Sequence, residues 1–333
     1  MSPSSLFLNL ISGALWALID LYAAGALIYL VLKLAAGDRL WPVAVLNNLA
    51  GPLLLPSLPL LALAAWQARW AEAAALGLGA LGFIWLFGDL FLPRLGRPRA
   101  GATRLRVMSF NMLSTWSSTE AVLDEIRQVD ADVVGLVEFP RARAEAIAAQ
   151  LGEVYPHQVQ YRDGIPGVGL VSKYPIVEAE NFELSYAKLT HVRAVVDAGG
   201  RRLTVFVAHP PPPAFMPIYT PRGASDIAEL ARRTTSDGPA LLMGDFNTAD
   251  VSDDYRILRR AGLVDAFRAA GLGFGWTWPA RNWRRRMRPL VRIDYIWHTR
   301  HFTATRAWVG ARTGSDHLPV IAELEWKDGN KKE

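Results

Sequence analysis

The chain has 333 residues, enough for two domains, and 51% of them are hydrophobic against a formal net charge of +5. It contains no cysteine, which excludes disulfide bonds, thiolate zinc sites and cysteine nucleophiles. Residues 1–92 carry three basic and four acidic side chains, so residues 93–333 hold a net +6. The basic character therefore belongs to the second part of the chain.

Three long apolar runs occupy the first part of the chain, over residues 6–32, 43–65 and 73–92. Asp20 and Asp89 are the ionisable residues within them, and each run has the ~20 residues that a helix needs to cross a bilayer. The runs have no polar face, which argues against helices of a soluble protein. We therefore predict a membrane domain over residues 1–92 with three transmembrane helices.

The second run contains Pro52, Pro56 and Pro59, and we expect a kinked or broken helix there. Membranes tolerate such breaks when neighbouring helices cover the freed carbonyl groups. Asp20 has no visible ion-pair partner in the sequence, so a packing or interfacial role is favoured over a functional intramembrane acid.

Three spans would place the 33–42 loop and everything after residue 92 on one side of the membrane. That side carries Lys33, Arg39 and several arginines, whereas the 66–72 loop carries Arg69. The positive-inside rule then predicts an integral protein of a bacterial-type inner or plasma membrane, with its second domain in the cytoplasm. The extracytoplasmic face is the alternative location of the second domain.

Residues 93–103 are a predicted linker, because proline, glycine and arginine occur there without periodicity. From residue 104 onward, apolar strand-like segments alternate with amphipathic patterns. Helices are expected over residues 120–129, 141–151, about 223–236 and 253–261. Strands are expected over residues 104–111, 132–139, 167–176, 191–198, 202–210, 239–247, 291–297 and 318–326. This alternation predicts a layered α/β or α+β domain over residues 104–333, with sheet at the centre and helices outside.

Polar side chains stand where these apolar segments end. They are Asn111, Glu138, His209, Asp245, Asn247, Asp294, Asp316 and His317. Each one alone has an ordinary explanation, because Asp and Asn after a strand commonly cap a helix or form a turn. Together they favour a functional site, since loops at the ends of strands are where sites are usually built.

The side-chain types suit hydrolysis at phosphorus. Carboxylate and amide oxygens without cysteine favour Mg²⁺ over zinc, with Mn²⁺ as the alternative. A metal on Glu138 would polarise a phosphoryl oxygen, and Asp245 could take a proton from water while Asn247 holds the phosphate or the water. His317, held by a carboxylate such as Asp294, would form an imidazolium that neutralises the transition state or protonates the leaving group.

Six motifs carry a resemblance to a known family: SFNM, GLVEF, GVGLVSKYPI, GDFN, RIDYIW and SDHLPV. Their order resembles that of the endonuclease/exonuclease/phosphatase superfamily, which includes proteins similar to deoxyribonuclease I, abasic-site endonucleases, inositol polyphosphate 5-phosphatases and neutral sphingomyelinases. The resemblance covers residues 104–326. It implies a four-layer sandwich of two packed central sheets flanked by helices.

The resemblance also implies roles for the residues of these motifs. Asn111, Glu138 and Asp316 would lie at the metal. Asp245 and Asn247 would orient and activate water. These implied roles agree with the chemistry that the side-chain types suggest.

The remaining implied roles concern the histidines. Asp294 would support His317, and His209 would contact the phosphate. Val137 departs from the family pattern, which usually has Gln before the metal Glu. The four prolines at 210–213 also depart from the pattern, which commonly reads Thr-His-Leu at the His209 segment.

Residues 276–292 form an unusual segment with three tryptophans and six arginines, and it leads directly into Asp294. The substrate-binding residues that we predict are Asn247, His209, Trp283, Arg284 and Arg285. Arginine neutralises phosphates and tryptophan stacks on bases, which suits a nuclease. The same residue types suit an anionic membrane interface. A solvated basic loop, with tryptophans covering a sheet edge, is the third interpretation.

A short linker would keep the second domain within tens of ångströms of the bilayer, where lipid phosphoesters are at high effective concentration. We therefore predict a membrane-anchored, Mg²⁺-dependent phosphoesterase that acts on a lipid headgroup or another membrane-associated phosphoester. The bilayer and a phosphorylated lipid are its predicted partners. A membrane-tethered nuclease, with nucleic acid as partner, is the first alternative, and a catalytically inactive binding module is the second. The sequence leaves open monoester against diester, the number of metal ions and the oligomeric state.

Overall fold

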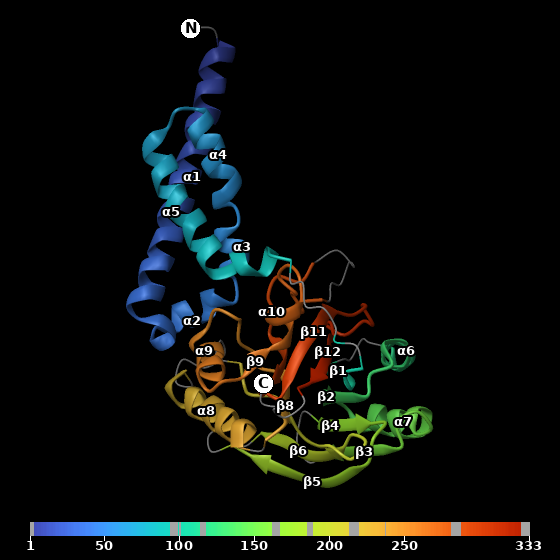
Figure 1. Ribbon diagram of the computed structural model, residues 1–333. Helices are drawn as coiled ribbons and strands as arrows, with labels where there is room; N and C mark the ends of the chain where they lie inside the picture. The colour runs from blue at the N-terminus through green and yellow to red at the C-terminus, as the bar shows by residue number, and fades with distance from the viewer. Residues whose placement is uncertain are drawn as a thin grey trace. The chain divides into compact units, whose positions relative to one another are not determined.

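The computed structural model describes residues 3–93, 99, 101–113, 118–161, 167–184, 189–212, 220–236, 238–280 and 288–327. The chain divides into two units, Met1–Asp89 and Leu90–Glu333 (Figure 1). The sequence analysis places the corresponding boundary between residues 92 and 93.

The first unit is helical. Its elements are α1 (Pro3–Ala35), η1 (Gly37–Arg39), α2 (Trp41–Asn47), α3 (Ala50–Leu54), α4 (Ser57–Trp66) and α5 (Trp70–Phe87), and the turn η2 (Gly88–Phe91) follows. Two helical stretches, Ser4–Ala35 and Trp70–Phe91, are long and apolar enough to cross a membrane. The bent pair Trp41–Asn47 and Ala50–Trp66 makes a third span if it is counted as one.

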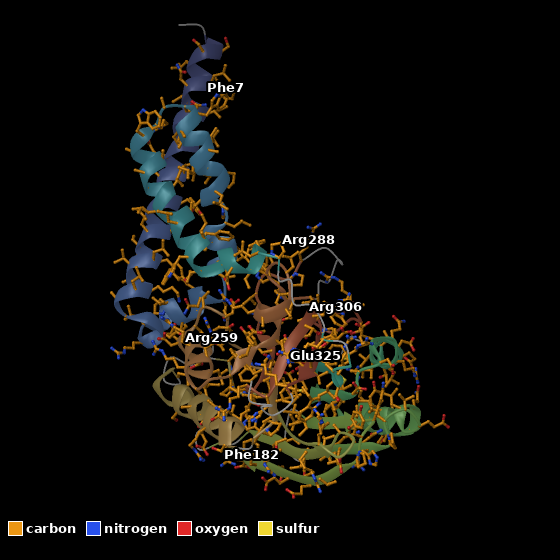
Figure 2. All side chains as sticks on the ribbon, in the orientation of Figure 1. Phe7, Phe182, Arg259, Arg288, Arg306 and Glu325 are labelled. Carbon is orange, nitrogen blue, oxygen red and sulfur yellow. The ribbon has the colours of Figure 1, made fainter. Side chains whose placement is uncertain are left out.

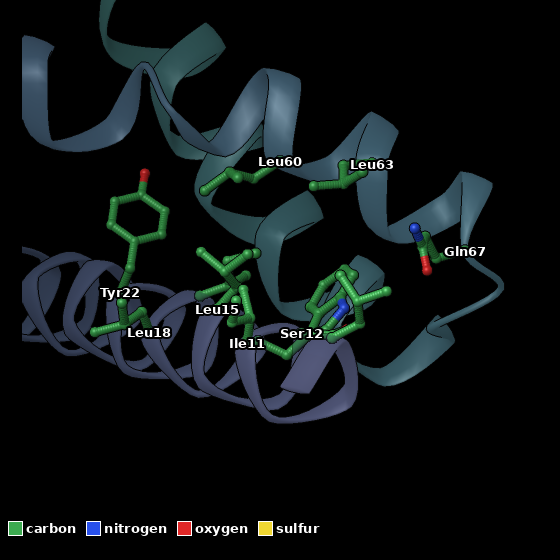
Figure 3. Close-up of a pocket in the computed structure, with 11 residues that line it drawn as sticks. Ile11, Ser12, Leu15, Leu18, Tyr22, Leu60, Leu63 and Gln67 are labelled. Carbon is green, nitrogen blue, oxygen red and sulfur yellow. The ribbon is translucent and has the colours of Figure 1, made fainter. Parts of the chain in front are cut away.

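Apolar side chains cover the outside of this unit. Phe7, for example, is 63% exposed and projects from α1 (Figure 2). Asp20 is also exposed on α1. A groove of about 600 Å³ runs between α1 and α4, and Leu15, Tyr22 and Leu60 are among its lining residues (Figure 3).

The break predicted in the second apolar run is confirmed. The helix axis turns by 85° between Trp41–Asn47 and Ala50–Trp66, ahead of the prolines, and a second interruption lies at Leu55–Pro56. There the Tyr22 hydroxyl donates a hydrogen bond of 2.8 Å to the carbonyl of Leu53. A neighbouring helix thus satisfies a carbonyl group that the interrupted helix leaves free.

In the second unit the described residues form two six-stranded sheets. The first has the order β11 (Phe302–Val309), β12 (Val320–Trp326), β1 (Arg104–Asn111), β2 (Val133–Phe139), β4 (Gly167–Ser172), β3 (His157–Tyr161). The second has the order β5 (Ile176–Glu183), β6 (Thr190–Asp197), β7 (Arg202–Ala208), β8 (Ala240–Asp245), β10 (Asp294–His298), β9 (Val264–Asp265). In each sheet the two middle strands, β1 with β2 and β7 with β8, are parallel, and all other neighbours are antiparallel.

The two sheets pack face to face and helices cover their outer faces. The layer between the sheets is built from side chains such as Val107, Val207 and Met243. The outer helices are α6 (Thr119–Val129) and α7 (Arg141–Leu151) on the first sheet, and α8 (Thr220–Ser236) and α9 (Asp253–Arg260) on the second. Strands buried on both faces have no polar alternation, which is why they read as continuous apolar runs. The predicted four-layer sandwich is therefore confirmed.

Four strands were not predicted from the sequence, namely β3, β5, β9 and β11. β5 is almost entirely exposed and lies at a sheet edge, so its side chains show no apolar pattern. The predicted strand 167–176 is divided, because β4 ends at Ser172 and the chain crosses to the other sheet to begin β5 at Ile176. Backbone pairing, and not side-chain burial, defines these edge strands.

Candidate active site

The parallel strand pairs bring four site residues to one edge of the sandwich. Asn111 is the last residue of β1, and Glu138 lies next to the last residue of β2. In the other sheet, Asp245 ends β8 and His209 follows β7. Parallel neighbours end at the same edge of a sheet, so these side chains can meet although they are far apart in the sequence.

Antiparallel strands deliver the remaining residues to the same place. β10 runs against β8 with Asp294 directly opposite Asp245. Asp316 and His317 precede β12, which runs antiparallel to β1. The ends of six strands therefore contribute to one cluster of polar side chains.

Asn111 lies at the centre of this cluster. Its side-chain amide nitrogen is 2.9 Å from Asp245 Oδ2, 3.1 Å from Glu138 Oε1 and 3.4 Å from His317 Nε2. Its Oδ1 accepts a hydrogen bond of 2.9 Å from the backbone N–H of Leu113. Asn111 was predicted as a metal ligand, and here it turns its NH₂ group toward the carboxylates while its oxygen serves the backbone.

His317 lies between two carboxylates. Its Nδ1 is 2.9 Å from Asp294 Oδ2, and its Nε2 is 3.6 Å from Asp245 Oδ2. Burial by itself would lower the pKa of His317, but the charges of Asp294 and Asp245 outweigh burial and raise the pKa to about 10. His317 is therefore an imidazolium near neutral pH, and its contact with Asp294 holds the ring in one orientation.

Asp245 is fully buried between two histidines. Burial raises the pKa of its carboxyl group to about 6, although the charge of His317 opposes that rise. Its Oδ1 accepts a hydrogen bond of 2.8 Å from the backbone N–H of Asn247. A carboxylate with a pKa near neutrality can both accept and release a proton at physiological pH.

His209 completes the cluster from the loop after β7. Its Nε2 is 3.0 Å from Glu138 Oε1 and 3.2 Å from the amide nitrogen of Asn247. Burial would lower the pKa of His209, but the hydrogen bond to Glu138 raises it above the ordinary value. The same hydrogen bond lowers the pKa of Glu138 against the effect of burial. His209 and Glu138 thus form an ion pair that is mostly shielded from solvent.

The backbone at the site is strained in two places. Glu138 has a φ of +57° and Asn247 a φ of +55°, a region that residues other than glycine seldom occupy. Such conformations cost about 1–3 kcal/mol each and persist where the surrounding structure imposes them. Gly244 is required for a different reason, because a Cβ there would lie 1.8 Å from the carbonyl oxygen of Ala208.

The cluster contains more acids than bases. Its acids are Glu138, Asp245, Asp294 and Asp316, and its bases are His209 and His317. Asp294 Oδ1 and Asp316 Oδ1 are buried and have no hydrogen-bond partner among the described residues. Most of the atoms that could ligate a metal here are oxygens, and the cluster keeps an excess of buried negative charge. A hard divalent cation therefore fits here.

Two groups of side chains have ligand atoms close enough for one ion. They are Glu138, His209 and Asp245, and Asp245, Asp294 and His317. Asp316 belongs to neither group. The pKa of Asp316 is raised, mainly by burial and to a smaller extent by the negative charge of Glu138, which lies near it. Glu138 and Asp316, two of the three predicted metal ligands, are therefore neighbours at the site.

A second buried cluster lies beside the site and was not recognised in the sequence. Arg292 donates to Asp265 Oδ2 at 2.7 Å and to Asp250 Oδ2 at 2.9 Å. Its side chain is 1% exposed, which corrects the prediction that places it in a surface segment. The Tyr295 hydroxyl donates 2.9 Å to the carbonyl of Thr248. This cluster ties the loop after Asp245 to the start of β10.

His191 is another residue that the sequence did not single out. Its Nδ1 accepts a hydrogen bond of 3.2 Å from the backbone N–H of His209. Burial lowers the pKa of His191 to about 3, so its ring stays neutral. A neutral ring leaves Nδ1 able to accept the hydrogen bond from the backbone N–H of His209. No motif marks this role, because it depends on the pairing of β6 with β7.

The structure brings together all the predicted site residues that it describes. Trp283, Arg284 and Arg285, three of the predicted substrate-binding residues, lie outside the described residues. Carboxylates, an amide and imidazoles at the strand ends offer the metal-ligating and proton-transfer groups that phosphoester hydrolysis requires.

Comparison with known proteins agrees with this class. The model of the Endonuclease/Exonuclease/phosphatase family matches residues 108–317, and the chain belongs to that family. No curated protein matches the chain in sequence. The family resemblance inferred from the sequence motifs is thus confirmed, and the chain belongs to a family of phosphoester hydrolases.

Solved structures share the fold at low sequence identity. An endonuclease/exonuclease/phosphatase from Bacteroides vulgatus is 19% identical, with a TM-score of 0.54 over 68% of this chain and 100% of that one. TDP2 from D. rerio, complexed with a single-strand DNA product, is 16% identical, with a TM-score of 0.53 over 67% and 99% of the two chains. The human Nocturnin catalytic domain, with a bound sulfate anion, is 17% identical, with a TM-score of 0.51 over 67% and 95%.

Proposed function

We propose that the protein is a membrane-anchored, Mg²⁺-dependent phosphoesterase that hydrolyses a lipid headgroup or another membrane-associated phosphoester by attack of water. The observation that carries the reaction is the buried contact of Asp245 with His317, beside the ion pair of Glu138 with His209. The observation that carries the location is the pair of apolar helical stretches long enough to cross a membrane.

The residues divide the work of hydrolysis. Asp245, with a pKa of about 6, takes the proton of the attacking water, and Asn247 orients that water or the phosphate. His317, which is cationic, neutralises charge on the phosphoryl oxygens or donates its proton to the leaving group. His209 contacts the phosphate.

The oxygen-rich end of the site suits a metal ion. Glu138 and Asp316 would hold Mg²⁺, with Mn²⁺ as the alternative, and the ion when bound supplies positive charge that polarises a phosphoryl oxygen. Asn111 bridges the two carboxylates Glu138 and Asp245 by donating to both of them. The charge count of the surrounding side chains supports a cation there.

The catalytic unit faces the cytoplasm in this proposal, because of the basic residues near the ends of the apolar runs. A reporter fused after residue 100 tests the orientation. Activity of a cytoplasmic reporter is expected, and activity of an extracytoplasmic one would reverse it.

A membrane-tethered nuclease is the second candidate function. Two observations favour it: the structural likeness to TDP2 complexed with a single-strand DNA product, and the six arginines of residues 276–292. Arginine, like lysine, neutralises nucleic-acid phosphates. A binding module of the same fold that has lost catalysis is the third candidate function.

A direct comparison of substrates separates these candidates. The full-length protein is given phospholipid or sphingolipid vesicles, and separately linear and circular DNA, each with Mg²⁺ or with EDTA. Hydrolysis of vesicle lipid that requires Mg²⁺ is the expected result. DNA cleavage far faster than lipid turnover would replace the lipid proposal with the nuclease, and no turnover of any substrate would leave the binding module.

A further inference from the structure

A row of aromatic and apolar side chains begins the second unit and continues into the loop after α10 (Ala266–Ala270). Phe91 packs edge-on against Phe274 with ring centroids 5.1 Å apart, and Phe274 stacks on Trp276 at 4.1 Å. Leu272 and Trp278 lie in the same loop, and Leu272 is 66% exposed. We name these five residues the aromatic ridge: Phe91, Leu272, Phe274, Trp276 and Trp278.

The ridge is attached to the end of an apolar helical stretch. Leu90 and Phe91 belong to the second unit, and they are also the last residues of the candidate span Trp70–Phe91. The backbone N–H of Gly273 donates a hydrogen bond of 2.7 Å to the carbonyl of Leu90. The loop is thus bonded to the point where the candidate span ends. Tryptophan is enriched at the headgroup layer, and phenylalanine and leucine accompany it on apolar faces that lie in the membrane interface.

The other end of the ridge is attached to the candidate active site. Trp278 pairs with Val291, three residues before Asp294, through backbone hydrogen bonds of 3.0 Å. Ala280 N–H donates 2.6 Å to the carbonyl of Asp316, and the Trp278 side chain hydrogen-bonds to the Asp316 carboxyl group. The ridge therefore borders two segments that carry site residues.

We propose that the aromatic ridge lies in the headgroup layer of the bilayer and holds the mouth of the site against the phosphoester of a membrane lipid. The proposal rests on the proposed function for the reaction, and it adds the surface through which the substrate is met. A lipid that stays in its bilayer can then reach Asp316 and its neighbours with little displacement out of the membrane. Water-soluble phosphoesters gain nothing from the ridge.

The absence of cysteine permits a direct test of position. A single Leu272→Cys variant of the full-length chain carries an environment-sensitive NBD fluorophore in vesicles of phosphatidylcholine and phosphatidylglycerol. Val177→Cys is the matched control, because Val177 is an exposed apolar residue, 41% accessible, on edge strand β5. Figure 1 shows β5 on the far side of the sandwich from α10.

We expect the label at position 272 to shift to shorter emission wavelength and to be quenched by phosphatidylcholine that bears a doxyl group near its headgroup. The label at position 177 should keep its aqueous emission and resist that quencher. Equal quenching at the two positions, or none at position 272, would overturn the proposal. Both labels share the same membrane tether, so tethering alone cannot produce the difference.

A kinetic comparison tests the part of the proposal that concerns lipid hydrolysis. Leu272→Glu should slow hydrolysis of vesicle lipid by roughly tenfold, because a charged side chain opposes insertion into the interface. Hydrolysis of soluble bis-p-nitrophenyl phosphate should be unchanged in the same variant, and Val177→Glu should change neither rate. Equal loss on both substrates, or no loss on lipid, contradicts the proposal. If no phosphoester is cleaved at all, the proposed function fails, whereas the fluorescence result still decides where the ridge lies.

Discussion

The second unit buries charge in two neighbouring places, around Asp245 and around Arg292, and the two clusters are balanced differently. Around Arg292 the guanidinium meets the carboxylates of Asp250 and Asp265, and Arg268 approaches Asp250 at 3.5 Å. Two cations there face two anions. Around Asp245, four carboxylates face two imidazoles, and two carboxylate oxygens have no partner among the described residues.

The difference separates a structural cluster from a functional one. Both clusters are buried and both contain charged groups, so burial of charge does not by itself mark a site. The Arg292 cluster balances its own charges, although Arg292 Nε has no partner among the described residues, and it acts as a brace between a loop and a strand. The Asp245 cluster keeps unsatisfied acid oxygens, and a bound cation would compensate their buried charge.

The largest effect is expected where the functional cluster is broken. Asp245→Asn should lower hydrolysis by about 10²–10⁴-fold, because the group that accepts the proton from water is lost. Folding should change little, since burial already disfavours the charged form of Asp245, whose pKa is raised to about 6. Initial rates and thermal unfolding of the full chain check both halves. An active Asp245→Asn protein would refute the role of this residue.

Breaking the Arg292 cluster should instead lower the free energy of unfolding. Arg292→Met leaves Asp250 and Asp265 buried without their cation and should cost about 3–5 kcal/mol of unfolding free energy. Urea denaturation measures the loss, and Arg232→Met is the control, since Arg232 forms an exposed ion pair with Glu229. Such surface pairs contribute about 0–1 kcal/mol. Equal stability of the two variants would show that the Arg292 cluster is not a brace.

Stabilisation by a bound metal ion should depend on the Asp245 cluster and not on the Arg292 cluster. Mg²⁺ at about 100 times its Kd should stabilise the wild-type chain by about 2.7 kcal/mol relative to EDTA. Glu138→Gln should abolish this stabilisation, because it removes an oxygen ligand from the site. Asp250→Asn should retain it, although the variant itself is less stable. Differential scanning calorimetry with and without Mg²⁺ reads out the contrast, and an Mg²⁺ response that survives in Glu138→Gln would place the ion elsewhere.

A pH-dependent effect concerns His191, which supports His209. Burial lowers the pKa of His191 from 6.5 to about 3, so the unfolded chain binds an extra proton between these two pH values. Stability is therefore fully present above pH 6.5 and falls by up to about 1.4 kcal/mol per pH unit as the pH drops through that window.

His191→Asn isolates this contribution. The amide oxygen of Asn can accept from the His209 N–H, but Asn does not titrate. Urea midpoints of the two proteins at pH 6.5 and pH 4.5 should show a steeper loss in the wild type. Parallel losses in both proteins would mean that His191 is not the titrating group.

Local patterns in the sequence were enough to recognise the apolar runs, the strand–helix alternation and the polar residue types at strand ends. The amphipathic pattern over 120–129 became α6, and the apolar segments became the central strands of both sheets. Periodicity succeeds there because it records how each segment is buried. The edge strand β5 was missed for the same reason, since its exposed side chains record no burial.

The sequence by itself thus determined the layered fold and the set of residue types available for chemistry. The reason is that the spacing of apolar residues within each segment reflects which of its faces is buried. Only the tertiary structure decided which of those residues meet. Asn111 donates to Asp245 across 134 positions of the chain, and Arg292 finds Asp250 and Asp265 inside the protein although its segment reads as a basic surface. Those partnerships follow from strand order and register, which are set by the packing of two sheets against each other and leave no periodic trace in any single segment.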